Sequence, residues 1–277
     1  MIKPSVSPDA GSEVRFQAYI NALSEEIGHA DRIDLLRRYC TGLLLPGERK
    51  SIEPMAARLD PRHVQATHQS LHHFVAKAPW SDAAVLKAVR EQVLPALTRH
   101  GPITAWILDD TSFPKKGTHS VGVARQYCGQ LGKQDNCQVA VSLSLANDGG
   151  SLPVAFDLYL PEEWLLIEWP ADDQEPSQYW LSTLPATTAL VDLVHRAKLR
   201  WRIERDYQDL KQELGLDHYE GRGWRGFHHH ATLCIAAYGF LVRERSLFPP
   251  DEHFRRPAPA LPPGWRPRGH SGAAGTP

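Results

Sequence analysis

The sequence is poor in sulfur and has no long apolar run. It contains 4 Cys and 2 Met in 277 residues, and Cys40, Cys128, Cys137 and Cys234 are scattered without a Cys-x-x-Cys spacing. This pattern argues against a structural zinc site and a disulfide framework, and it predicts reduced thiols. No apolar run reaches the ~18 residues of a membrane span, and residues 1–9 lack the apolar core of a secretory signal. We therefore expect a cytoplasmic protein that does not associate with membranes.

Positive and negative charge balance over the whole chain but not along it. The formal net charge is −1. Residues 101–190 contain 4 basic and 11 acidic residues, whereas residues 191–277 contain 14 basic and 10 acidic residues. An acidic middle followed by a basic part suits a carboxylate metal site beside a phosphate-binding surface, although ordinary domains also vary in charge. The proportions of hydrophobic (42%) and charged (23%) residues are those of a globular protein.

The first hundred residues show helical periodicity. Apolar residues recur at helical spacing over residues 14–45, where Pro46-Gly47 breaks the run. Shorter helices are predicted at residues 52–59, 62–76 and 81–100. The first two of these, joined by a short turn, resemble a helix-turn-helix, and a small helical bundle fits the same pattern. In the helix-turn-helix interpretation the second helix exposes Gln65, His68, Gln69 and His72.

The period changes after Gly101. The apolar residues 103–108 predict a buried strand that ends in Asp109-Asp110-Thr111. Further strands are predicted, in chain order, at residues 121–123, 138–146, 152–160, 163–169 and 178–184. The sequence Asn-Asp-Gly-Gly at residues 147–150 predicts a hairpin turn.

A charged helix is predicted from about residue 188 to Gly215, followed by a loop over residues 217–226 and an apolar helix at 228–243. Residues 249–277, rich in Pro, Gly and Arg, are expected to be disordered.

One face of the charged helix carries the candidate chemistry. At about 100° per residue, Arg200, Glu204, Tyr207 and Lys211 share one stripe beside an apolar stripe. A solvated face with i,i+4 ion pairs explains the same spacing. Alternatively, Glu204 and a carboxylate at a strand end converge on Mg²⁺, which favours carboxylate oxygens and water. Arg200 and Lys211 would then hold phosphates.

Several motifs together resemble the DDE transposases of bacterial insertion sequences. These are Asp-Asp-Thr at 109–111, Ser-Val-Gly-Val-Ala-Arg-Gln-Tyr-Cys-Gly at 120–129, Arg-Trp-Arg-Ile-Glu-Arg-Asp-Tyr-Gln-Asp-Leu-Lys-Gln-Glu-Leu-Gly-Leu-Asp at 200–217, and shorter matches at 45–51 and 229–234. The helix is similar to the branch with a Tyr-Arg-Glu-Lys signature. Its last three positions match Arg200, Glu204 and Lys211, whereas Ala197 stands where that branch has Tyr.

The resemblance implies an RNase H-like sheet in a mixed α+β fold. Residues 1–100 would form a helical domain that binds DNA in the helix-turn-helix interpretation, residues 101–248 the catalytic domain, and residues 249–277 the tail. The first catalytic Asp matches Asp110, with Asp109 as a neighbour that orients the loop, and the catalytic Glu matches Glu204. Both would bind Mg²⁺ or Mn²⁺.

The resemblance also implies DNA as the partner, meaning element ends and target DNA. From the helix we expect contacts by Arg200, Tyr207 and Lys211. From the loops we expect contacts by Lys115, Lys116, Arg222, Trp224 and Arg225. For the loop positions, a solvated loop and an inward-packed Trp are the alternatives.

The second catalytic Asp of the family has no counterpart here. The family places it at the end of a fourth strand, and no such stretch lies between Leu160 and Glu204. We therefore hypothesise an internal deletion with its junction at residues 161–164, and an RNase H-like sheet that is incomplete. The transposase would then be catalytically impaired. The alternative is a non-enzymatic remnant that binds DNA or dimerises, either with itself or with an intact transposase.

Overall fold

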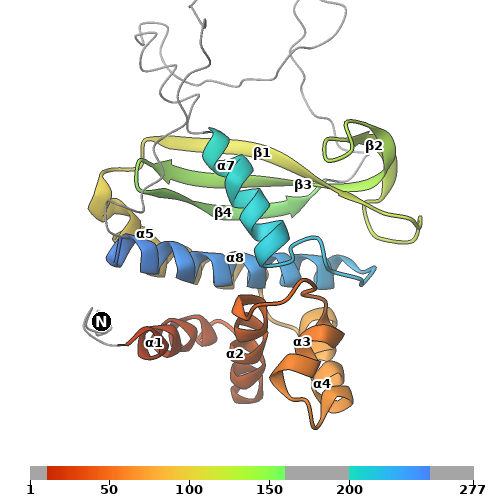
Figure 1. Ribbon diagram of the computed structural model, residues 1–277, viewed down its shortest axis with the longest axis horizontal. Coiled ribbons are helices and arrows are strands. Elements are labelled where there is room, and N and C mark those ends of the chain that lie inside the picture. Colours follow the sequence, from red (N-terminus) through yellow and green to blue (C-terminus); the bar gives the residue numbers. More distant parts are fainter. Residues whose placement is uncertain (1–10, 160–199, 250–277) are drawn as a thin grey trace, which may run out of the picture.

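Helices lie before and after one antiparallel sheet in the computed structural model, which describes residues 11–159 and 200–249 (Figure 1). In chain order the elements are α1 (Ser12–Ser24), α2 (Ala30–Leu44), α3 (Ile52–Leu59), α4 (Val64–Ala76), α5 (Asp82–Leu97), the 3₁₀ turn η1 (Thr98–His100), β1 (Ala105–Pro114), β2 (Ala124–Cys128), β3 (Lys133–Asn147), β4 (Gly150–Leu158), α7 (Arg200–Gln208), the π-helical turn η2 (Asp209–Glu213) and α8 (Trp224–Leu247). This order confirms the predicted mixed α+β fold, with helices ahead of the sheet. It is also consistent with an incomplete RNase H-like sheet.

The expected N-terminal helices are present, with small shifts at their ends. The apolar run over residues 14–45 forms two helices, and Gly28, at a φ of 75°, lies between them. Helix α3 occupies the predicted residues, and α4 begins at Val64 rather than at residue 62. Ser81 caps α5 by accepting the N–H of Ala84. Gly101, at a φ of 124°, ends the η1 turn as predicted.

Strand β3 organises the sheet. One of its edges pairs with β1, from Ala105 opposite Ala146 to Pro114 opposite Cys137. Its other edge pairs with both β2 and β4. The predicted hairpin turn connects β3 to β4, where the Asn147 side chain accepts the N–H groups of the two glycines that follow Asp148. Within the described part of the chain, β3 is the only strand that pairs with β1.

Two strand predictions are wrong. Strand β1 does not end at the acidic pair but continues to Pro114, because the long strand β3 offers it partners along its whole length. Residues 121–123 form no strand, and Gly122 adopts a positive φ of 66° there. The strand that was missed is β2, which begins at Ala124. It is short and exposes Tyr127, so it lacks the apolar run that identifies a buried strand.

Helix α8 is the centre of the molecule. Figure 1 shows it lying beneath the sheet, with α1 to α4 on its other side. It packs on α5, on β4 and on the N-terminal helices. Its side chains are buried on every side from Gly226 to Phe240, which is the pattern of a helix enclosed by protein. The helix begins at Trp224, four residues before the predicted start at residue 228.

Three consecutive histidines connect α8 to different parts of the fold. His228 Nε2 lies 3.2 Å from the N–H of Leu158 at the end of β4. His229 stacks on Trp80 with ring centroids 3.6 Å apart. His230 Nε2 lies 2.9 Å from the carbonyl oxygen of Gly215. Successive residues point about 100° apart on a helix, so one short stretch reaches the sheet, the α4–α5 link and the turn after η2.

Several predictions lie outside the described residues. They are the strands at 163–169 and 178–184, the junction at 161–164, and all but the first residue of the disordered tail at 249–277. The division into domains stays a prediction. Among the helices that the structure describes, none has the length and apolarity needed to cross a bilayer.

His230 makes the stability of the fold depend on pH. A carbonyl oxygen only accepts, so Nε2 carries the proton toward Gly215 and Nδ1 accepts the hydroxyl of Tyr39 at 2.8 Å. Burial lowers the pKa of His230 to about 4. In the unfolded chain the pKa of this histidine is near 6.5, so the unfolded chain binds a second imidazole proton more tightly than the folded chain does. The free energy of unfolding should therefore fall by about 3 kcal/mol between pH ~6.5 and pH ~4. Urea unfolding across this range measures it.

The matched controls are His230→Gln and His72→Gln. The first removes the titrating group, so its pH dependence should be shallower than that of the wild type. The second changes an exposed histidine and should leave the dependence unchanged. Equal slopes for the wild type and His230→Gln would contradict the assignment.

Candidate metal and DNA site

The acidic pair lies in the middle of β1, with its two residues on opposite faces of the sheet. Asp109 is opposite Ser142 and Asp110 is opposite Val141, and residues directly opposite each other share a face. Asp110 belongs to the outer face with Leu108, which is 60% exposed. Ser142 belongs to the face that α7 covers. The register therefore places Asp109, rather than the predicted Asp110, on the side of α7.

Tyr207 joins α7 to two strands. Its hydroxyl lies 2.5 Å from Ser142 Oγ on β3 and donates to the backbone oxygen of Asp109 on β1 at 3.3 Å. The side chain is 7% exposed, and burial raises the pKa of its hydroxyl well above the ordinary range. The expectation that Tyr207 contacts DNA gains no support from this placement. Its observed contacts hold the helix of Glu204 against the strand that carries the acidic pair.

Asp206 is a second anchor of α7, and no local sequence pattern singles it out. Its carboxylate accepts the hydroxyl of Tyr238 on α8 at 2.5 Å and the hydroxyl of Ser151 on β4. The residue is 7% exposed. A charged residue in a charge-rich helix reads as solvated from the sequence alone, and only the tertiary structure shows that this one is buried.

Lys211 lies in η2, where the helix widens into one π-helical turn. The backbone N–H of Leu214 bonds to the carbonyl of Asp209, five residues earlier. Lys211 Nζ donates to the backbone oxygen of Ser112 on β1 at 2.8 Å and lies 4.8 Å from the ring centre of Phe113. Burial lowers the pKa of Lys211, and the attraction of nearby carboxylates, which raises it, only partly offsets this shift. Gly215, at a φ of 67°, ends the turn as predicted.

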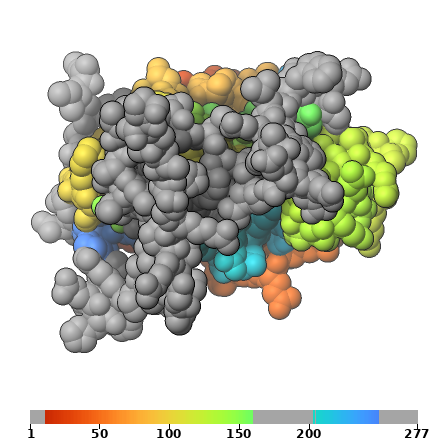
Figure 2. All heavy atoms as spheres, turned by 90° about the horizontal axis from the view of Figure 1, so that it is seen from above, coloured from red at the N-terminus to blue at the C-terminus, as the bar shows by residue number. Residues whose placement is uncertain are grey.

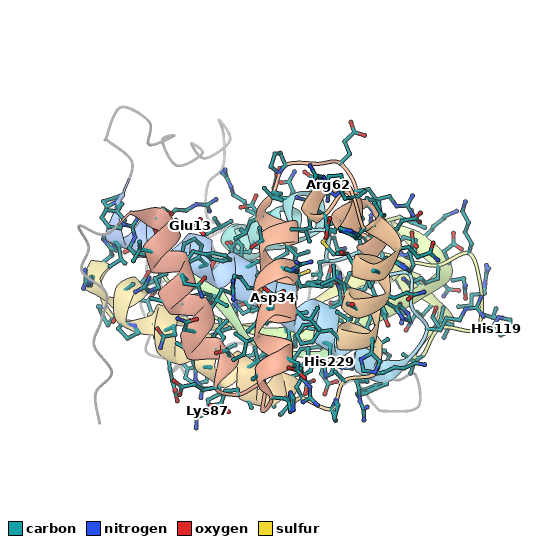
Figure 3. The ribbon with its side chains drawn as sticks, turned by 90° about the horizontal axis from the view of Figure 1, so that it is seen from below. Glu13, Asp34, Arg62, Lys87, His119 and His229 are labelled. Carbon is teal, nitrogen blue, oxygen red and sulfur yellow. The ribbon has the colours of Figure 1, made fainter. Side chains whose placement is uncertain are left out.

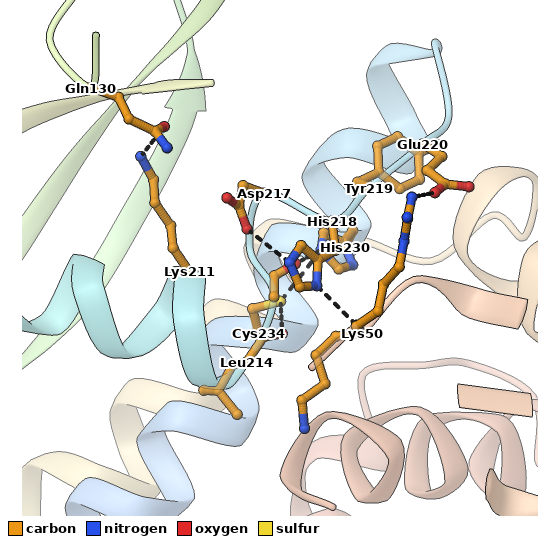
Figure 4. A network of polar contacts seen from close by, with 12 residues as sticks. Lys50, Gln130, Lys211, Leu214, Asp217, His218, Tyr219, Glu220, His230 and Cys234 are labelled. Atoms are coloured by element: carbon orange, nitrogen blue, oxygen red, sulfur yellow. Dashed lines mark hydrogen bonds and ion pairs between the residues drawn. The ribbon is translucent and has the colours of Figure 1, made fainter. Parts of the chain in front are cut away.

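The polar contacts beyond η2 tie it to the N-terminal helices (Figure 4). His218 Nδ1 accepts the backbone N–H of Lys50 at 2.8 Å. The ammonium of Lys50 in turn donates to the carbonyls of Leu43 and Leu45 at the end of α2. Arg49 forms an ion pair with Glu220. The motif at residues 45–51, noticed only as a family resemblance, thus holds the loop that follows the helix of Glu204.

The predicted loop cations differ in their exposure to solvent. Lys115 Nζ lies 3.4 Å from the carbonyl oxygen of Tyr219, and burial lowers its pKa. Lys116 and Arg222 are exposed. The β1–β2 loop and the loop before α8 are joined by the N–H of Val121, which bonds to the carbonyl of Arg222 at 2.9 Å. His119 lies at the outer end of the β1–β2 loop (Figure 3).

Trp224 and Arg225 were predicted in a loop and instead form the first turn of α8. Trp224 is 41% exposed and its ring centroid lies 4.1 Å from that of His228. Arg225 is exposed and donates to the carbonyl of Lys77 at 3.1 Å. Both residues therefore lie at the end of α8 that follows Arg222, whose carbonyl accepts the N–H of Val121 in the β1–β2 loop.

The described side chains do not by themselves form a metal site. Glu204 and Arg200 belong to α7, but their side chains lie outside the described residues. Among the side chains that are described, no three of His, Cys, Asp and Glu come close enough to hold a metal ion. What the structure brings together is the strand with the acidic pair, the helix with Glu204, and Lys211. Figure 2 shows α7 and the turn after it (cyan) reaching the surface beside the β2–β3 hairpin (yellow-green).

We predict that the Tyr207–Ser142 contact contributes measurably to stability. Tyr207→Phe removes one buried hydroxyl and leaves Ser142 Oγ without this bond, so the free energy of unfolding should fall by about 1–2 kcal/mol. In a double-mutant cycle with Ser142→Ala, the coupling should be about 1 kcal/mol. Tyr127→Phe is the control, because Tyr127 is exposed and its change should stay within about 0.5 kcal/mol. Equal effects of the two Tyr→Phe changes would contradict the prediction.

The sequence matches a known protein family over much of the chain. The family described as "DDE superfamily endonuclease" matches residues 22–206, more than half of the chain, from α1 through the sheet to Glu204 and Asp206. A curated relative, the probable transposase for insertion sequence element IS701 of Microchaete diplosiphon, is 39% identical over 97 residues. That alignment covers 35% of this chain and only 25% of the relative. No solved structure matches. This chain therefore belongs to the DDE superfamily endonucleases and is related to the DDE transposases of insertion sequences.

Proposed function

We propose that this chain is an insertion-sequence DNA transposase by descent, whose partner is the DNA at the ends of its element. The observation that carries the proposal is the contact between α7 and β1, because it brings the helix of Glu204 to the strand of Asp109 and Asp110. The carboxylate of Glu204 and that of one Asp of the pair would hold Mg²⁺ or Mn²⁺, for which carboxylate oxygens are suitable ligands. The bound metal would polarise a phosphodiester and help activate a water or hydroxyl nucleophile.

The chain's own residues have two roles in this proposal. Tyr207 and Asp206 hold α7 against the sheet, which fixes the backbone of Glu204 relative to the acidic pair. Lys211 adds a positive charge beside β1, although its ammonium already bonds to Ser112. DNA phosphates would meet the exposed side chains at the joined loops and the start of α8, namely Lys116, Arg222, Trp224 and Arg225, and Lys115 and Arg200 are further candidates for DNA contact.

We further propose that catalysis is impaired. The family's second catalytic Asp has no counterpart in the sequence between Leu160 and Glu204, and loss of one ligand from a two-metal site removes stabilisation of the transition state. An internal deletion with its junction at residues 161–164 accounts for the gap. A full-length relative that aligns continuously through these residues would contradict the deletion.

A second candidate function is a non-enzymatic DNA-binding remnant that dimerises with itself or with an intact transposase. The separation of the exposed cations from the acidic pair favours it. Lys116, Arg222 and Arg225 lie on loops and on the start of α8, so DNA contact there needs no metal. Such a product would occupy element ends without cutting them.

Gel-shift and nicking assays with DNA that carries the element's ends test these proposals. We expect binding in buffer with Mg²⁺ or Mn²⁺ and no nicking. The double variant Arg222→Ala, Arg225→Ala should weaken binding and reduce the slope of log affinity against log salt by about 1–2, because each cation releases about one counterion. Lys87→Ala, an exposed cation on α5, is the control and should change neither quantity.

Two results would contradict the proposal in different ways. Mg²⁺-dependent nicking that disappears in Glu204→Ala would show that catalysis is intact. Failure to bind element ends at low salt would remove DNA as the partner of both candidate functions.

Mn²⁺ binding, followed by electron paramagnetic resonance, decides which Asp of β1 serves the metal. The register favours Asp109 and the family motif favours Asp110. If the register is right, Asp109→Asn should weaken Mn²⁺ binding by about tenfold or more, which corresponds to roughly 1.4 kcal/mol, and Asp110→Asn should change it little. The opposite result would support Asp110. Asp148→Asn, an exposed Asp in the β3–β4 turn, controls for charge.

A further inference from the structure

Helix α7 is held to its surroundings by two adjacent polar residues that point in different directions. Tyr207 bonds to β3 and β1, whereas Asp206 bonds to β4 through Ser151 and to α8 through Tyr238. Neighbouring residues point about 100° apart on a helix. Two anchors at this angle fix both the rotation of α7 and its position along its axis, which a single contact would leave free.

Burying the Asp206 carboxylate costs desolvation free energy that a purely structural contact would not require. A carboxylate that is removed from water loses hydration, and an apolar side chain of similar size often stabilises such a position equally well. What the carboxylate adds is direction, because each of its two oxygens accepts one hydroxyl along a defined line. Tyr238 and Ser151 are themselves buried, at 3% and 2% exposure, on elements of the core.

The bond to Tyr238 also matters for the metal site proposed above. Tyr238 lies on α8, the most enclosed helix, and burial together with the Asp206 carboxylate raises the pKa of its hydroxyl. The hydroxyl therefore stays protonated and donates. Through this bond the helix that carries Glu204 is attached to α8, at the centre of the fold, as well as to the sheet.

We propose that Asp206 is a positioning residue, which together with Ser151 and Tyr238 fixes the backbone of α7, the helix that carries Glu204, against the sheet that contains β1. This inference rests on the proposed function for its metal, but the anchoring of α7 itself does not. Asp206 touches neither the metal nor DNA in this scheme. Its effect on the metal site passes through Glu204, two residues earlier in the same helix.

The test combines amide hydrogen exchange with Mn²⁺ binding, both on the full-length protein. Asp206→Ala should speed exchange in α7 by about tenfold or more, because a buried charge-assisted bond is lost. Exchange in β3 and in the middle of α8 should change less than about twofold. Mn²⁺ affinity should fall by about tenfold, approaching the value for Glu204→Ala.

A graded series separates positioning from general destabilisation. Asp206→Asn keeps one acceptor oxygen, and a hydroxyl can accept from its amide, so it should recover much of the Mn²⁺ affinity. Ser151→Ala and Tyr238→Phe each remove one bond and should give intermediate losses. Gln208→Ala, an exposed position on the same helix, is the control and should resemble the wild type.

The outcomes are distinguishable. Unchanged exchange in α7 for Asp206→Ala would overturn the anchoring. Faster exchange with unchanged Mn²⁺ affinity, in a protein whose affinity depends on Glu204, would overturn the positioning role. If the wild-type protein binds no Mn²⁺, the proposed metal site fails, the link to Glu204 fails with it, and the exchange data alone decide whether Asp206 anchors α7.

Discussion

The burial of α8 is the constraint on which the rest of the structure depends. A helix that is enclosed on all sides must satisfy each polar side chain that it carries, because water does not reach it. Its three histidines meet this demand by bonding outward to Leu158, to the carbonyl of Val75 or of Trp80, and to Tyr39 and Gly215. The sheet, the N-terminal helices and the turn after η2 are thereby held around one axis. Loss of α8 packing would separate all three.

Helix α7 depends on a different kind of contact. It is short and lies over the sheet, where Ile203 on α7 and Leu210 on the adjoining η2 are the buried aliphatic residues among those described. Its buried hydroxyl and carboxylate groups supply the direction that so small an apolar surface cannot. This division suits a site in which a carboxylate on a helix must meet a carboxylate on a strand. Apolar packing holds the helix against the sheet, and directional hydrogen bonds determine its position along the strand.

The sequence predicted what local pattern controls. Helical periodicity located α3, α4 and α5, the Asn147 turn was recognisable from its residues, and Gly215 was identified as a helix end. Features set by partners distant in sequence were missed. The end of β1 depends on the length of β3, strand β2 is recognisable only beside β3, and Trp224 is helical because α8 extends under the sheet.

The candidate site divides in the same way. The motif match located β1, α7 and Glu204, because those residues follow one another in sequence. Whether Asp109 or Asp110 turns toward α7 depends on pairing with Ser142, which no local pattern reveals. Asp206 and Tyr207 looked like members of a charged helix, and their burial arises only when Ser151, Tyr238 and Ser142 are brought to them.

The π-helical turn η2 limits how the chain can change length. A π turn contains one residue more than the α turn it replaces. A chain one residue shorter between Gln208 and Gly215 could form a regular α-helix there with better backbone bonding. However, every residue on one side of the change would rotate by about 100° relative to the other side. Lys211 would then leave Ser112, or Tyr207 would leave Ser142. We therefore infer that insertions and deletions at this point are excluded by geometry, even though the local helix would gain from one.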